Sequence, residues 1–64
     1  MASLTSTQIR QRLGKCADSP YKVMALRNIR IAGIAARQNN RNEAETFRAE
    51  AQYLLQYAEA NSRK

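Results

Sequence analysis

The chain has 64 residues and carries 11 Lys and Arg against 5 Asp and Glu, for a formal net charge of +6. Its sequence pI is near 10.3. This length predicts a single domain over residues 1–64 and excludes a two-domain enzyme. A chain this short buries only about 60% of its unfolded surface, so it needs exceptional packing, a staple or a partner subunit. A disulfide or a zinc staple is excluded because Cys16 is the only cysteine and there is no His. We therefore expect a homo-oligomer, most simply a dimer.

The composition also limits where the chain can act. No apolar run approaches the roughly 18 residues that span a bilayer, and residues 1–17 lack the continuous apolar segment of a secretory signal. Those residues do contain Arg10, Arg12 and Lys15 without an acid, which is also the composition of a mitochondrial transit peptide. We prefer to interpret them as a basic helix of the fold, because their removal would leave too few residues for a comfortable core. A cytoplasmic location, without a membrane and with Cys16 reduced, is the expectation.

The first predicted element is a short helix over residues 6–17. Any residue of the Thr-Ser-Thr run at 5–7 can cap its N-terminus. Gly14 weakens the helix by about 1 kcal/mol relative to Ala, so we expect it to depend on packing against the rest of the chain. Its apolar residues follow the i, i+4, i+7 spacing of one helical face: Ile9, Leu13 and Cys16.

The second predicted helix covers residues 20–38. Ser19 suits an N-cap, and Pro20 suits the first helical position, where its missing N–H is no loss. The helix is apolar on every side, and such a helix needs burial on every side. Two other helices of one chain cannot surround it, so we expect it to pack centrally in a dimer. Asn28 would then either set the register across the dimer or lie at a solvent-facing edge. The expected interface residues are Met24, Asn28, Ile31, Ala35, Val23, Leu26 and Ile34.

The third predicted helix covers residues 43–61, after a polar turn. Asn42 and Glu45 have the spacing of a capping box. Tyr53 and Tyr57 lie on one face of this helix, where they either cover the first helix, the interpretation we prefer, or form an exposed aromatic pair for a partner. Two helices of similar length joined by a short turn predict an antiparallel helical hairpin. The predicted fold is therefore all-α: a short N-terminal helix and a long helical hairpin that dimerises into a four-helix core.

Charge is concentrated in the first two thirds of the chain. Residues 1–41 carry eight basic residues and one acid, Asp18, for a net +7. Part of this charge must face outward, because the two Glu that flank the apolar face of the third predicted helix, Glu43 and Glu50, cannot neutralise it. Arg outnumbers Lys eight to three, and guanidinium groups bind phosphate and carboxylate bidentately. The predicted anion-binding residues are Lys22, Arg27, Arg30, Arg37 and Arg41, with Arg10, Arg12 and Lys15 as auxiliaries.

Catalysis is not predicted. The chain has no His for acid–base work, Cys16 has no His partner, and no Gly-rich phosphate loop is present. We expect neither a metal nor a cofactor, and a protein that is not an enzyme.

Two functions of different class remain. The first is a small regulator that binds nucleic acid through its Arg-rich helix face and the turn. The second is a protein-interaction module, an inhibitor or adaptor, that docks a mixed apolar and basic helix face on an acidic groove. Exposed aliphatic side chains beside the cations would favour the protein partner, because phosphate contact does not require them.

Overall fold

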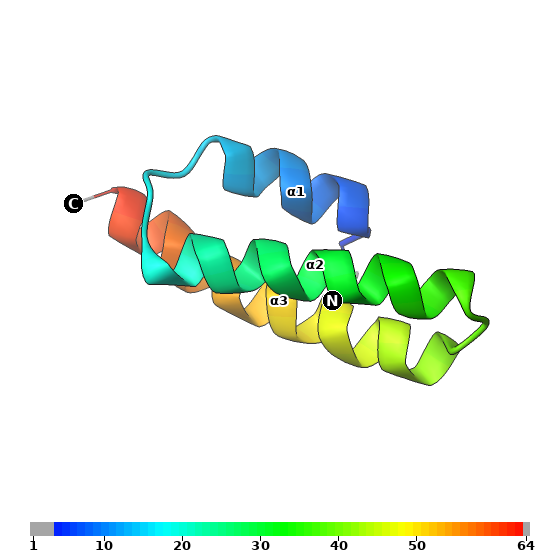
Figure 1. The fold of residues 1–64 in the computed structure, drawn as a ribbon. Coiled ribbons are helices and arrows are strands. Elements are labelled where there is room, and N and C mark those ends of the chain that lie inside the picture. The colour runs from blue at the N-terminus through cyan, green and yellow to red at the C-terminus, as the bar shows by residue number, and fades with distance from the viewer. Residues whose placement is uncertain (1–3, 64) are drawn as a thin grey trace.

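The structure, a computed structural model, describes residues 4–63. Over this range it contains three helices and no strand, so the predicted all-α class is confirmed. Figure 1 shows α2 and α3 running antiparallel side by side, with α1 lying along one side of this α2–α3 pair. The helices are α1 (Ser6–Gly14), α2 (Pro20–Arg37) and α3 (Arg41–Ser62).

Both ends of α1 have a local cause. Thr5 is the N-cap: its side chain accepts a hydrogen bond from the Gln8 backbone N–H at 3.2 Å, and the Gln8 side chain accepts one from the Thr5 N–H at 2.9 Å. This reciprocal pair is a capping box. The helix ends at Gly14, three residues before the predicted end, because the N–H groups of Lys15 and Cys16 bond to carbonyls three residues back and tighten the last turn.

The start of α2 follows the prediction, with Ser19 as N-cap and Pro20 in the first turn. The start of α3 does not. Asn39 adopts a left-handed conformation with φ 60°, and Asn40 then caps α3 by accepting a hydrogen bond from the Glu43 N–H at 3.3 Å. The predicted capping box at Asn42 is therefore wrong, and α3 begins two residues earlier than expected. Asn tolerates the left-handed region, so the chain reverses direction before position 42.

The core lies where α1 packs against the α2–α3 pair, and many of its side chains are small. Five of its eleven buried apolar residues are Ala, which lets α2 and α3 approach closely. Ile9 and Leu13 of α1 supply half of the large side chains that are fully buried. The four such side chains are Ile9, Leu13, Ile29 and Leu55.

Polar contacts fix α1 and the segment before it on the α3 side. The Arg12 guanidinium forms a bidentate ion pair with the Glu59 carboxylate, with N–O distances of 2.9 and 2.7 Å. The Leu4 N–H donates to Gln52 Oε1 at 3.0 Å, and Arg48 donates to the Leu4 carbonyl at 2.9 Å. These bonds position α1, and with it Arg10, over the α2–α3 pair.

Candidate nucleic-acid interface

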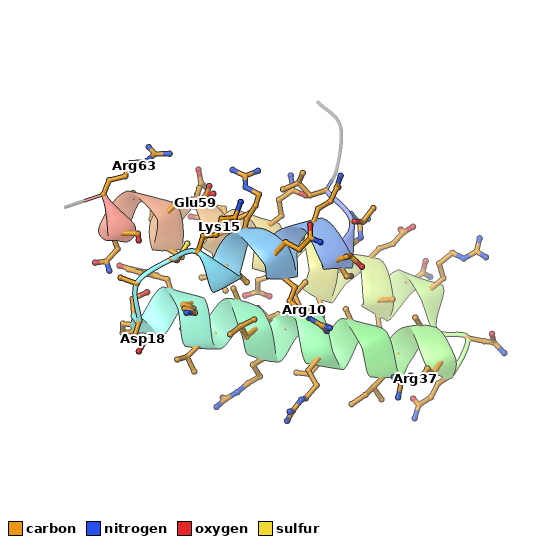
Figure 2. The ribbon with its side chains drawn as sticks, turned by 90° about the horizontal axis from the view of Figure 1, so that it is seen from above. Arg10, Lys15, Asp18, Arg37, Glu59 and Arg63 are labelled. Atoms are coloured by element: carbon orange, nitrogen blue, oxygen red, sulfur yellow. The ribbon has the colours of Figure 1, made fainter. Side chains whose placement is uncertain are left out.

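A groove between α1 and α2 gathers three arginines. Its volume is about 420 Å³. Arg10 extends from α1, and Figure 2 shows it reaching toward α2, with Arg37 near the far end of that helix. None of the residues that line the groove is acidic. We call it the arginine groove, lined by Arg10, Ile29, Arg30, Gly33, Ile34 and Arg37.

The guanidinium groups of this groove have no carboxylate partner within the described chain. The ion pairs of residues 4–63 are Arg12 with Glu59 and Lys22 with Asp18. All three groove arginines are exposed at the surface. Three cations around one concave surface without an acid produce a positive potential that attracts anions.

The five predicted anion-binding residues separate in the structure. Arg30 and Arg37 lie together in the arginine groove. The Lys22 amine is instead held locally, 3.1 Å from the Cys16 carbonyl and 3.4 Å from the Asp18 carboxylate. The other two, Arg27 and Arg41, do not line the groove, and Arg41 borders a second groove at the turn, with Ala36, Asn39 and Ala44.

Arg10, predicted only as an auxiliary anion-binding residue, completes the arginine groove. Its neighbour Ile9 is fully buried, which places Arg10 at an edge of α1 about 100° around the helix. Whether that edge meets α2 or α3 depends on how α1 docks. No spacing within residues 6–17 carries that information.

The outer face of α2 mixes aliphatic and basic side chains. Val23 is 56% exposed, Ile34 47% and Leu26 36%. Arg27 and Arg30 lie among them on the same side of the helix. We call Val23, Leu26, Arg27, Arg30 and Ile34 the mixed face. Of the seven residues expected at a dimer interface, three therefore belong to the mixed face. Met24, Asn28 and Ile31 follow a separate stripe of α2, and Ala35 of that stripe is buried within the chain.

The tyrosines form a cluster on the surface of the α2–α3 pair. Tyr57 stacks on Tyr21 of α2 with 5.6 Å between ring centroids, and its hydroxyl lies 3.0 Å from that of Tyr53. All three rings are exposed, so the preferred interpretation that Tyr53 and Tyr57 cover α1 is wrong and the exposed pair is what forms. The hydrogen bond with Tyr53 raises the pKa of Tyr57 above its ordinary value of 10.0.

Gly33 is exposed on α2 at the floor of the arginine groove, and a Cβ added there would meet no atom within 4 Å. Because its φ is not positive, nothing in the backbone requires Gly. We expect Gly33→Ala to raise stability by about 1 kcal/mol, through the higher helix propensity of Ala. A thermal melt followed by circular dichroism should show a rise of about 4–8 °C. An unchanged or lower Tm would mean that the groove floor has no room for a methyl group.

A third groove, at the other end of α1, gives a useful contrast. Arg12, Lys15 and Arg63 line it, but so does the Glu59 carboxylate, which already pairs with Arg12. Lys15, Glu59 and Arg63 lie at the same end of the molecule in Figure 2. Basic residues therefore line both this groove and the arginine groove, but of these two only the arginine groove has no acid in its lining.

Metal binding and membrane insertion each need a feature that residues 4–63 do not have. No group of three or more metal-ligating side chains occurs among them. None of their helices has the length and apolar character needed to cross a membrane. Comparisons with protein-family models, curated proteins and solved structures found no match to this chain.

Proposed function

We propose that this chain is a small, non-enzymatic regulator that binds nucleic acid through the arginine groove. The single observation that carries the proposal is that three arginines from two helices line one groove that no acid lines. Guanidinium forks bind phosphate oxygens bidentately, which is why arginine is favoured where phosphate is recognised.

The spacing of the groove arginines suits a phosphate backbone. Arg30 and Arg37 are two helical turns apart, which is about 10.5 Å along α2. With α2 parallel to the axis of a DNA duplex, that distance corresponds to about three phosphates of one strand, which follow each other about every 3.4 Å of helix axis. Arg10 lies across the groove from them and adds a third contact. The amide-rich turn that contains Asn39 and Arg41 supplies further donors for phosphates or base edges.

We expect the chain to bind labelled duplex DNA and single-stranded RNA, with an affinity that falls steeply between about 50 and 200 mM salt. The variant R30Q/R37Q should lower the slope of log affinity against log salt by about 1.8 on duplex DNA, because each phosphate contact contributes about 0.9. Fluorescence anisotropy titrations at several salt concentrations measure this slope.

The matched control is K15Q/R63Q, which removes the same charge from the groove that Glu59 also lines. Its slope should stay close to that of the wild type. Equal losses in the two variants would show that general basicity, and not the arginine groove, is responsible. No binding at the lowest salt would rule out the proposed function altogether.

A second candidate function is a protein-interaction module, and the exposure of Val23 and Ile34 on the mixed face favours it. Phosphate groups do not bind these aliphatic side chains. A groove on a partner protein that is apolar inside and acidic at its rim would bind both the aliphatic side chains and the arginines. The variant Val23→Ser separates the two functions, because Val23 does not line the arginine groove. It should leave nucleic-acid affinity unchanged and should weaken capture of a specific acidic protein that the wild type retains.

The proposed regulator also acts as a homodimer. Only four large side chains are fully buried in the described chain, and a core this small rarely supplies more than about 3–5 kcal/mol. A second copy is the remaining source of buried apolar surface.

A further inference from the structure

The α2–α3 pair has one covered and one uncovered face. On α3, the Glu59 carboxylate pairs with Arg12 of α1, and Tyr57, two residues earlier, lies about 200° around the helix from it. On α2, the Lys22 amine donates to the Cys16 carbonyl. Met24 follows Lys22 by two residues, so it also lies about 200° around its helix, away from the covered side. Tyr57 and Met24 are both exposed, and no described element covers the side of the pair on which they lie.

Apolar side chains line this uncovered side along its length. Ile31 and Phe47 are half-buried, while Met24 is 49% exposed. Polar residues lie among them. Asn28 comes four residues after Met24, and Glu50 comes seven residues before Tyr57, so Asn28 shares the face of Met24 and Glu50 shares the face of Tyr57. We call this surface the open face: Met24, Asn28 and Ile31 of α2, and Phe47, Glu50 and Tyr57 of α3.

We propose that a second copy of this chain docks on the open face, with α2 of each copy packed on α3 of the other. This inference rests on the proposed homodimer and names its surface and arrangement. It uses Met24, Asn28 and Ile31 of the expected interface. Of the mixed face it uses only Arg27, which lies at the border, so the rest of that face and the arginine groove stay in solvent.

The charges at the edges of the open face favour packing of α2 on α3 of the second copy over packing of α2 on α2. Arg27 borders the open face on the α2 side, adjacent to Met24 and Ile31 on the helix surface, and Glu50 lies on the α3 side. Neither forms an ion pair within residues 4–63. If α2 packed on α2 of the second copy, arginine would face arginine and glutamate would face glutamate, and like charges in contact oppose association. Packing α2 on α3 brings opposite charges together instead.

The level of the residues agrees with this pairing. Tyr21 stacks on Tyr57, so these two residues lie at the same level along the helix pair. Because α2 and α3 are antiparallel, the numbers of any two level residues, one from each helix, add up to about 78. A twofold axis parallel to the helices keeps each residue at its own level. Arg27 of one copy is then level with position 51 of the other, beside Glu50, and Asn28 comes level with Glu50 itself. The carboxylate can therefore accept from both side chains.

A charge-swap experiment on the full chain tests the proposal. Sedimentation equilibrium should give the wild type twice its monomer mass of 7.3 kDa at micromolar concentration. Glu50→Arg and Arg27→Glu should each weaken the dimer about tenfold or more, and the combination R27E/E50R should restore most of the affinity, because the ion pair is re-formed with reversed sign.

Glu45→Arg is the matched control, since Glu45 is exposed on α3 about 140° away from Glu50 and undergoes the same charge change. It should leave the dimer intact. A monomeric wild type would overturn both the dimer and its surface. If Glu50→Arg weakened the dimer no more than Glu45→Arg does, the α2-on-α3 arrangement alone would be overturned. The same would follow if R27E/E50R did not recover dimer affinity. Nucleic-acid binding is measured separately, so none of these outcomes depends on it.

Discussion

Leu13→Ala should abolish cooperative folding or lower the Tm by at least about 10 °C. Leu13 is fully buried and is one of only four large side chains in that state. Truncating such a leucine costs about 2–5 kcal/mol, and a core of this size rarely supplies more than about 3–5 kcal/mol in total. A helix as short as α1 is also unstable without tertiary packing, so its detachment would expose the α2–α3 pair that it covers.

Circular dichroism at 222 nm, recorded on thermal melts at one fixed protein concentration, measures this loss. Gln11→Ala is the matched control, because Gln11 is exposed on the same helix and substitutions at such sites change stability by no more than about 0.5 kcal/mol. If Leu13→Ala melted at the same temperature as Gln11→Ala, α1 would not be part of the cooperative core.

Local signals in the sequence were sufficient for the helices themselves. The Asp18-Ser19-Pro20 segment marks the start of α2 because capping and the fixed φ of proline act within a few residues. The predicted start of α3 is two residues late because, of two adjacent asparagines, one can reverse the chain and the next can cap the helix. Asn39 reverses the chain and Asn40 is the N-cap. Sequence spacing alone favours Asn42 as N-cap equally.

The candidate site could be predicted only in part, since it depends on docking as well as on helical spacing. Arg30 and Arg37 lie seven residues apart on one helix, so their proximity follows from the period of the helix. Arg10 joins them because α1 docks along the α2 side at that point. Lys22 does not line the groove with them, because its amine donates to the Cys16 carbonyl in the preceding loop. Contacts of this kind are formed by tertiary structure and leave no periodic pattern.

The tyrosines illustrate the same limit. Their four-residue spacing correctly places Tyr53 and Tyr57 on adjacent turns, but spacing does not say which neighbouring helix a face will meet. The side of α3 that carries Glu59 and Gln52 meets α1 and the segment before it. Ile9 and Leu13 of α1 are buried against the α2–α3 pair, so α1 covers that side and the tyrosines are left on the surface.

Ala51→Leu should destabilise the chain by about 1–3 kcal/mol, because overpacking a close helix crossing forces the helices apart. Ala51 on α3 and Ala25 on α2 are both fully buried in the shared core, so a larger side chain has no space to occupy. Ala49→Leu adds the same volume to the same helix at an exposed position and should be close to neutral. Urea unfolding of both variants at equal concentration measures the difference. Equal midpoints would show that α2 and α3 are separated widely enough at this point to accept leucine, and the close approach inferred from the alanine-rich core would then be wrong.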